Sequence, residues 1–355
     1  MTRHQRGGAT PPRPAGFAIR PYGGAVDHPG MTTAITAVRR ADGNLDAATV
    51  QGMDEHYIHL GDELALDCVI IERGDAIVGY ARVTRDDLVD GTATISLFVV
   101  LDPSARGLGA EPAIVADRLP RAVAVVRDLA ATRATRLGAI CQGSHAALRS
   151  ALEAVGFRVV REGAILVRAD LEDIPEVPLP AGYELRPVAD GDRAMARRIY
   201  DANKRAFADS WGETAPSDEE FADVFSATNF QPRHYQVAYH GDEIAGMVLA
   251  YMAEPEADGS LTGMTEGITV QAEHRRRGLA RALLASAMRS VKAAGAVRAA
   301  LSVDLQNPNQ AAVLYQAMGF RSVGSEYEME LGRWAAGETP EVPDGTAPRG
   351  PGLAR

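Results

Sequence analysis

The fold of this 355-residue chain is decided by the stretch Gly267-Ile268-Thr269-Val270-Gln271-Ala272-Glu273-His274-Arg275-Arg276-Arg277-Gly278-Leu279-Ala280-Arg281. The β-branched residues at its start predict the end of a strand, and the apolar residues from Leu279 onward recur at helical spacing. No Ser, Thr, Asp or Asn caps the helix that begins at or just after Gly278. The free N–H groups and positive dipole of its first turn are therefore available to an anion, and the neighbouring arginines add charge. We interpret this turn as a phosphate cradle.

A second informative segment is Leu301-Ser302-Val303-Asp304-Leu305-Gln306-Asn307-Pro308-Asn309-Gln310-Ala311-Ala312-Val313-Leu314-Tyr315-Gln316-Ala317-Met318-Gly319-Phe320. The Arg-x-x-Gly-x-Ala pattern of the first stretch resembles the acyl-CoA pyrophosphate loop of the GCN5-related N-acetyltransferases (the GNAT family). The Asn-Pro, Leu-Tyr and Gly-Phe pairs of the second segment fall at that family's relative positions. A basic turn before a helix is, by itself, more often a solvated surface. The two segments, in this order and at this separation, together indicate an acetyltransferase fold.

Composition excludes several other classes of protein. The 47 acidic and 37 basic residues give a net charge of −10, which argues against nucleic-acid binding and mildly favours cationic substrates. Only Cys68 and Cys141 are present, so a disulfide scaffold or a thiolate zinc site is excluded, and we expect two reduced core thiols. No His, Asp or Glu cluster has ligand spacing, so we expect no metal. The sequence has no apolar run of about 18 residues and no signal-peptide pattern, so we expect no membrane partner and a cytoplasmic location.

The chain repeats itself at long range, which indicates duplicated domains rather than a solenoid. Three pairs of short segments match in the same order and at nearly the same offset: Gly16–Pro21 with Gly182–Pro187, Gly74–Gly79 with Gly241–Gly246, and Gly156-Phe157 with Gly319-Phe320. Each half predicts a strand, two helices, a hairpin, a strand, a helix, a strand, a helix and a final strand.

The predicted fold class is therefore α/β, with two tandem GNAT-like domains, each a mixed, mostly antiparallel sheet flanked by helices. This arrangement resembles the mycothiol synthase group of tandem acetyltransferases. We expect disordered tails at residues 1–15 and 333–355, a degenerate first domain at 16–170, a Pro-rich linker at 171–181 and a catalytic second domain at 182–332.

The first half has a weaker version of the cradle, between Leu101 and Glu111. Only one arginine remains there, and counting back from Gly107 puts Ser104 at the position of Arg275. Glu111 supplies a negative partner to its helix dipole from within the chain.

The first half also lacks the polar residues that follow the cradle in the second half. Aligned on the Gly-Phe pairs, Leu152 replaces Tyr315 and Ser144 replaces Asn307. We interpret the first half as a structural or substrate-framing domain. The alternative is that it binds a CoA that does not react.

The resemblance implies how the second half binds acetyl-CoA, its expected cosubstrate. Backbone groups at the end of the strand hold the pantetheine arm, main-chain N–H groups after Arg275 hold the pyrophosphate, and Asn307 reaches the pantetheine or the loop beyond the next strand. The expected cofactor-binding residues are Ile268, Thr269, Val270, Arg275, Arg276, Arg277, Gly278, Leu279, Ala280, Arg281 and Asn307.

Acetyl transfer from a thioester to an amine needs placement, a neutral amine, a donor for the oxyanion and a proton for the departing thiolate. The resemblance assigns the proton donor to Tyr315, and the alternative is a buried core tyrosine. Glu266 is the candidate base, because it lies four residues before Val270 and hence on the same face of a regular strand. The alternatives for Glu266 are an exposed edge carboxylate and an anchor for substrate charge.

The region between the first two helices of the second half frames the acceptor pocket in the family. Phe207, Asp209 and Trp211 lie there and are the candidate substrate-binding residues. Aromatic side chains in such a loop either stack on a substrate or pin the loop to the core.

These observations predict an acetyl-CoA-dependent N-acetyltransferase that acts on a primary amine of a small molecule by direct attack, with the second half catalytic. One rival is a CoA-binding regulatory or sensor protein without transferase activity, and another is a protein amine acetyltransferase. The sequence leaves the acceptor, the acyl chain preference and the oligomeric state open.

Overall fold

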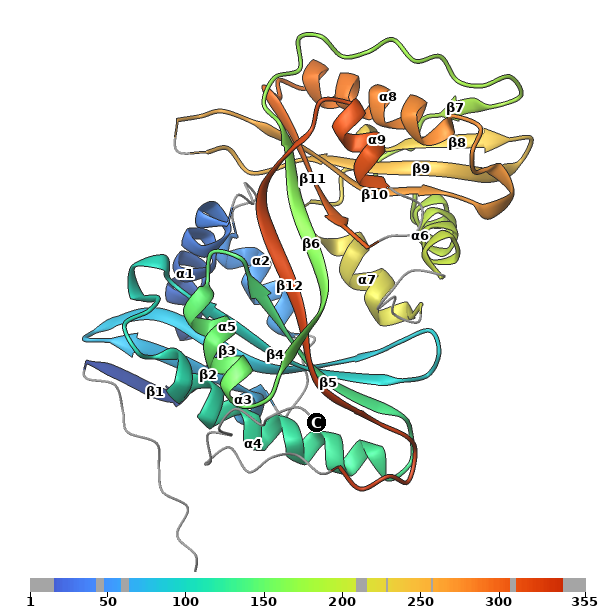
Figure 1. Ribbon diagram of the computed structural model, residues 1–355. Helices are drawn as coiled ribbons and strands as arrows, with labels where there is room; N and C mark the ends of the chain where they lie inside the picture. Colours follow the sequence, from blue (N-terminus) through green and yellow to red (C-terminus); the bar gives the residue numbers. More distant parts are fainter. Residues whose placement is uncertain are drawn as a thin grey trace, which may run out of the picture.

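The computed structural model describes residues 16–42, 48–58, 64–208, 216–227, 229–256, 258–306 and 311–340. These residues form two lobes that share one continuous 12-stranded sheet (Figure 1). The strand order is β1-β2-β3-β4-β5-β12-β6-β11-β10-β9-β8-β7.

The elements follow the predicted order in both halves, with one short additional helix, α3. The first half contains β1 (Phe17–Pro21), α1 (His28–Ala41), α2 (Val50–Ile58), α3 (Leu64–Asp67), β2 (Cys68–Arg73), β3 (Ala76–Asp87), β4 (Ala93–Leu101), α4 (Glu111–Ala130), β5 (Thr135–Gln142), α5 (Ala146–Ala154) and β6 (Arg158–Arg168). The second half contains β7 (Glu184–Arg186), α6 (Arg193–Phe207), α7 (Asp218–Ser226), β8 (Gln236–His240), β9 (Glu243–Met252), β10 (Thr262–Val270), α8 (Leu279–Ala293), β11 (Arg298–Asp304), α9 (Ala311–Ala317) and β12 (Arg321–Trp334). The α/β class and the mostly antiparallel, helix-flanked sheets are confirmed.

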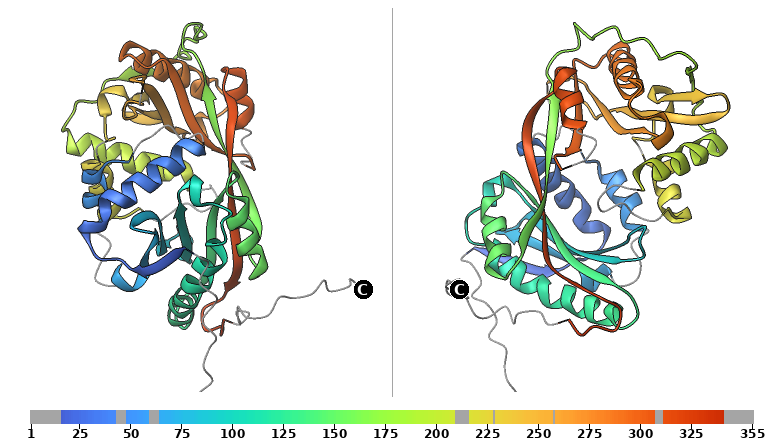
Figure 2. Two further views of the ribbon diagram at one scale, coloured as in Figure 1. Left: turned by 90° about the vertical axis from the view of Figure 1, so that its left-hand side faces the viewer. Right: turned by 45° about the vertical axis from the view of Figure 1, so that its right-hand side comes forward.

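The two halves exchange their last strands. β6, from the first half, pairs with β11 of the second, and β12, from the second half, pairs with β5 of the first. β6 and β12 also pair with each other and cross between the lobes side by side (Figures 1 and 2). Each lobe in space therefore includes one strand from the other sequence repeat.

The exchange corrects the expected C-terminal tail. Arg333 and Trp334 do not belong to a tail but end β12, where they pair with Arg136 and Thr135 of β5. The Trp334 side chain is buried, and the N–H of Gly337 donates to the carbonyl of Ala130. The strand continues past residue 332 because it runs to the far end of β5, a requirement that local composition does not reveal.

The core of the second lobe positions the cradle. One face of α8, which includes Leu283, Ala287 and Val291, is buried against the sheet. A Cβ atom at Gly263 of β10 would lie 2.3 Å from the Val291 side chain, so glycine lets α8 approach the strand closely. Among the described helices, none is long and apolar enough to cross a membrane.

Candidate active site

A gap opens between β10 and β11 because their parallel pairing covers only the first part of each strand. The pairing runs from Thr262 opposite Arg298 to Met264 opposite Ala300. Beyond it, β10 has a bulge between Glu266 and Thr269, where its register with β9 shifts. Gly267 in the bulge has a φ of +57°, a conformation that favours glycine.

A cavity with a volume of about 600 Å³ lies at this gap. We call it the donor cavity, after the acetyl-CoA site that the family resemblance implies. Its walls come from the end of β10, the loop before α8, the end of α6, β11 and α9. The lining residues are Ala206, Phe207, Glu266, Gly267, Ile268, Thr269, Val270, His274, Arg275, Arg276, Gly278, Leu279, Ala280, Arg281, Ser302, Val303, Asp304, Ala311, Leu314 and Tyr315.

The predicted cradle lies at one end of the donor cavity. A 3₁₀ turn, η4 (Ala272–His274), leads into the loop, and α8 begins at Leu279 with no side-chain cap. Gly278 has a φ of +83°, and Arg276 is the one non-glycine residue among the described residues with a positive φ, of 63°. The free N–H groups of the first turn therefore remain available, as the sequence predicted.

The three consecutive arginines of the cradle have different roles. The Arg275 side chain is committed to the protein, because its Nε donates to the carbonyl of Val270 at 3.0 Å and its Nη2 to the carbonyl of Ala206 at 3.1 Å. Arg277 turns back to donate to the carbonyl of Glu273 and is not part of the cavity lining. Arg276 is exposed and lines the cavity. Arg275 thus shapes the loop, and Arg276 can contact a ligand.

The first half retains the geometry of this loop, which corrects the sequence alignment. Arg106 Nε donates to the carbonyl of Leu101, five residues earlier, just as Arg275 does to Val270. Arg106, and not Ser104, therefore occupies the position of Arg275. Counting from Gly107 was misleading because the loop contains two glycines, and it is the second, Gly109 with a φ of 94°, that corresponds to Gly278.

The first-half cradle is filled by its own carboxylate. Glu111 is 1% exposed, and its Oε1 accepts the N–H of Gly107 at 2.6 Å and lies 3.1 Å from Nε2 of His145. Burial acts to raise the pKa of this carboxyl, but the hydrogen bonds from His145 and Gly107 outweigh it, and the pKa is lowered. An ionised carboxylate thus lies where the second half leaves its N–H groups free.

Glu266 lies at the junction of two cavities, because it lines both the donor cavity and a second one between the lobes. Its Oε1 accepts the N–H of Ser302 on β11 at 3.0 Å. Burial raises its pKa to about 7, and the Ser302 hydrogen bond offsets this only in part. A carboxylate of this pKa can accept a proton near neutral pH.

Tyr315 lies on α9 at the wall of the donor cavity and is 6% exposed. Burial raises the pKa of its hydroxyl, and the charge of Glu266 raises it further, which places the two groups within electrostatic reach of each other. Among the described residues, none accepts a hydrogen bond from this hydroxyl. The phenol therefore keeps its proton and can donate it.

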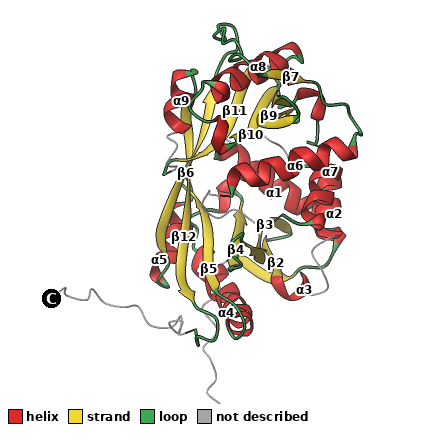
Figure 3. Ribbon diagram, turned by 90° about the vertical axis from the view of Figure 1, so that its right-hand side faces the viewer, coloured by secondary structure: helices red, strands yellow, loops and turns green. Residues whose placement is uncertain are grey.

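The second cavity lies between the lobes and has a volume of about 630 Å³. We call it the acceptor cleft, after the acceptor pocket that the family resemblance implies. Figure 3 shows helices α1, α2, α6 and α7 gathered between the lobes on this side of the molecule. The cleft is lined by Ile35, Arg39, Ala48, Thr49, Gly52, Met53, Glu55, His56, Tyr57, Tyr80, Arg82, Phe98, Asp223, Val224, Ser226, Ala227, Asn229, Phe230, Gln231, Tyr235, Leu249, Tyr251, Met252, Glu254, Glu266 and Gly267.

Arg82 is the most distinctive cleft residue from the first half. Its guanidinium lies 5.3 Å from the ring centroid of Tyr57 and 5.9 Å from that of Phe98. Its two Nη atoms lie 3.3 and 3.4 Å from Nε2 of His56, while its Nε is buried with no partner among the described residues. A buried donor without a partner is suited to bind an acceptor atom of a ligand.

The structure brings together most of the sequence-predicted residues. Asn307, Asp209 and Trp211 lie outside the described residues, and Phe207 lines the donor cavity rather than the acceptor cleft. Sequence reasoning missed the contributions of Ser302, the Ala206 carbonyl and Arg82. No local motif marks these residues, since each acts through a contact between distant segments.

Comparison with known proteins agrees with this geometry. Residues 196–320 match the acetyltransferase (GNAT) family. The chain is 28% identical over 259 residues to the mycothiol acetyltransferase of Kocuria rhizophila, covering 71% of this chain and 80% of that protein. It is 27% identical over 345 residues to the mycothiol acetyltransferase of Acidothermus cellulolyticus, covering 92% and 98%.

The overall fold also matches a solved structure. A GCN5-related N-acetyltransferase from Sphaerobacter thermophilus superposes with a TM-score of 0.67 at 22% identity, covering 95% of this chain and 100% of that one. The whole two-lobed arrangement is therefore shared, and at this identity the likeness concerns the fold.

Proposed function

From the tandem GNAT architecture of this N-acetyltransferase, we propose that the chain transfers an acetyl group from acetyl-CoA to a primary amine of a small molecule by direct attack, and that residues 182–332 carry out the chemistry. The observation that carries this proposal is that Glu266 and Gly267 line both cavities. A donor in one cavity and an acceptor in the other would meet at these two residues.

Acetyl-CoA is the donor that suits the cavity between β10 and β11. The free edge of β10 at Ile268 and Val270 offers backbone groups to the pantetheine amides, which replace the interrupted pairing with β11. The first turn of α8 offers N–H groups to the pyrophosphate. Thr269 Oγ1 is buried without a partner among the described residues, and it lines the same cavity.

The reaction then uses two groups of opposite character. The amine nitrogen attacks the thioester carbonyl while the Glu266 carboxylate removes a proton from it, directly or through one water. The tetrahedral intermediate collapses, the C–S bond breaks, and Tyr315 gives its proton to the departing thiolate. The products are the acetylated amine and CoA. Glu266, with a pKa of about 7, is suited to accept the proton of the amine. Tyr315, whose pKa is raised, stays protonated and is suited to donate the proton to the thiolate.

The first half takes part as a wall of the acceptor cleft. Its cradle is occupied by Glu111, so it does not bind a second acetyl-CoA. Its Tyr57, Tyr80 and Arg82 face the cleft shared with the second half. We therefore expect the acceptor to carry, besides its amine, an anionic or strongly polar group that Arg82 binds, and a cleft of about 630 Å³ fits a small molecule.

Release of the CoA thiol with a panel of amines tests the proposal. The name of the two relatives makes a cysteinyl-sugar amine the first acceptor to test, followed by aminoglycosides, polyamines and a lysine peptide. We expect turnover of a small amine, and we expect Arg82→Gln to raise KM for that amine more than it lowers kcat. Binding of acetyl-CoA without turnover of any amine would favour the sensor instead, and turnover of the peptide alone would favour a protein acetyltransferase.

A further inference from the structure

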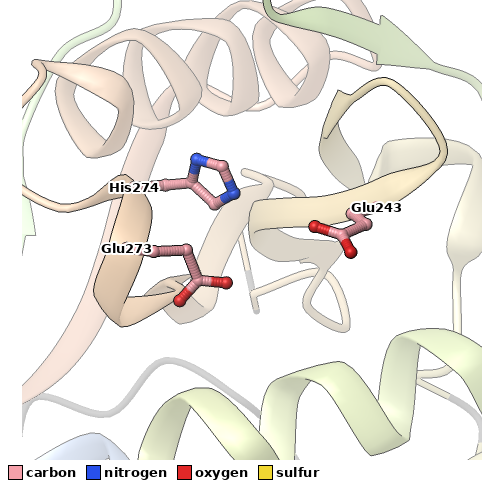
Figure 4. Close-up of side chains that lie close together, drawn as sticks. All are labelled: Glu243, Glu273 and His274. Carbon is pink, nitrogen blue, oxygen red and sulfur yellow. The ribbon is translucent and has the colours of Figure 1, made fainter.

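Three side chains with metal-ligand atoms converge beside the cradle, and two of them, Glu243 and Glu273, line neither cavity. Glu243 starts β9, and Glu273 and His274 belong to η4, immediately before Arg275. One ligand atom of each lies within 4.8 Å of the other two. Figure 4 shows the imidazole and both carboxylates around a common space.

The histidine of this cluster is held as a metal-binding histidine would be. His274 is 6% exposed, and its Nδ1 lies 2.9 Å from the hydroxyl of Tyr183. Its other ring nitrogen has no partner among the described residues and is turned toward Glu243 in Figure 4. A partner on one ring nitrogen that fixes the tautomer and orientation of the other is the usual outer-shell arrangement of a ligating imidazole.

His274 lies close to both carboxylates without pairing with either. No ion pair within 4.0 Å joins His274 to Glu243 or Glu273 in the described part of the chain, although the ligand atoms of all three lie within 4.8 Å of one another. Two metal–ligand bonds of about 2.0–2.2 Å span at most about 4.4 Å. Two ligand atoms of a tetrahedral ion at these bond lengths lie about 3.4 Å apart. Both glutamates are exposed, so rotation of their side chains can close the remaining distance of roughly 1 Å.

We propose that Glu243, Glu273 and His274 form a binding site for a divalent transition metal, with zinc as the ion that one imidazole and two carboxylates suit, and that this ion ties the β8–β9 hairpin to the cradle loop. The site has three protein ligands and leaves a position for water. Because His274 also lines the donor cavity, an ion bound to it fixes the cradle loop and adds positive charge beside the donor cavity. By linkage, metal and acetyl-CoA then favour each other's binding. This replaces the expectation from sequence that the chain has no metal site.

Calorimetric titration of the tag-free full chain with ZnCl₂ tests the site, without using the transferase reaction. We expect one Zn²⁺ per chain and a loss of affinity of at least about tenfold in Glu243→Gln, which leaves the cradle loop untouched. Tyr183→Phe should weaken binding about tenfold through its effect on His274. Asp242→Asn is the matched control, since it removes the neighbouring exposed carboxylate, which is not in the cluster, and should stay within twofold of wild type.

Absence of Zn²⁺ binding by wild type, or equal binding by wild type and Glu243→Gln, would overturn the site. A second titration, with acetyl-CoA, tests the coupling. We expect Zn²⁺ to tighten acetyl-CoA binding about fivefold in wild type and in Asp242→Asn, but not in Glu243→Gln. Zn²⁺ binding that leaves acetyl-CoA affinity unchanged would overturn the proposal that the ion ties the hairpin to the cradle loop in a way that favours acetyl-CoA binding. Failure of acetyl-CoA to bind at all would count against the proposed function and not against the metal site.

Discussion

Replacing Glu266 with glutamine should make the protein more stable above neutral pH. The folded state raises the pKa of this carboxyl from 4.5 to about 7, because burial disfavours the charged form. The stability that comes from the protonated form is fully present below pH 4.5 and is lost as pH rises through 7. Wild type therefore carries a buried charge at pH 8.5 that Glu266→Gln lacks. Glutamine still offers an oxygen to the N–H of Ser302.

The two pKa values set the size of the effect. A difference of one pKa unit corresponds to about 1.4 kcal/mol, so the change from 4.5 to about 7 gives an upper value of about 3 kcal/mol. The carboxylate faces two cavities that water can enter, so we expect about 1–3 kcal/mol at pH 8.5. At pH 5, where the unfolded carboxyl ionises but the folded one stays protonated, we expect a difference of less than about 1 kcal/mol.

Urea unfolding of both proteins at pH 5 and pH 8.5, followed by circular dichroism, measures this difference. Glu176→Gln, in the exposed linker, removes the same charge and should show no pH-dependent difference. The reasoning would be refuted if Glu266→Gln were less stable than wild type at pH 8.5, or if the two differed equally at both pH values. The stabilised variant should be catalytically impaired, because glutamine cannot accept the proton of the amine. In wild type, kcat/KM should rise with pH through about 7 as the Glu266 carboxyl ionises.

Three further predictions concern single residues. Tyr315→Phe should lower CoA release by roughly 10² to 10⁴ with acetyl-CoA affinity nearly unchanged, and activity within about twofold of wild type would show that another group is the acid. Arg275→Lys should weaken acetyl-CoA binding about tenfold by calorimetry, because lysine cannot bridge the carbonyls of Val270 and Ala206; an unchanged Kd would remove Arg275 from the loop's support. Glu111→Gln should lose about 1–3 kcal/mol of stability at pH 7, because it replaces the charge-assisted hydrogen bonds that the Glu111 carboxylate makes with the Gly107 N–H and His145. Since the pKa of Glu111 is lowered, this loss should shrink as pH falls toward the carboxyl's titration, and a loss that grows on acidification would contradict the assignment.

The features that sequence predicted are those that local chemistry determines. The order of elements follows from periodicity, and the uncapped helix start after Gly278 needs only the residues around it. The cradle of the first half was harder, because two glycines fit the pattern and only the Arg106 contact with Leu101 identifies the equivalent one.

The features that sequence could not predict depend on pairing between distant segments. The local sequences of β6 and β12 predict a strand whichever sheet each of them joins, so they do not predict the exchange. Glu266 was assigned by strand parity with Val270, yet the bulge at Gly267 shifts the register between these two residues and interrupts that parity. The support for Glu266 comes instead from its place in the lining of both cavities. The position of Arg82 in the cleft depends on the packing of the two lobes.

The claim that only the second half binds the donor is tested most directly by the stoichiometry of acetyl-CoA binding in a pair of equivalent variants. Gly278 and Gly109 have φ values of 83° and 94°, so replacing either with glutamate imposes similar backbone strain on its own cradle loop. Calorimetry should give one acetyl-CoA per chain for wild type and for Gly109→Glu, and no measurable binding for Gly278→Glu when circular dichroism confirms that both variants are folded. Two sites in wild type, or loss of binding in Gly109→Glu with retention in Gly278→Glu, would contradict the account.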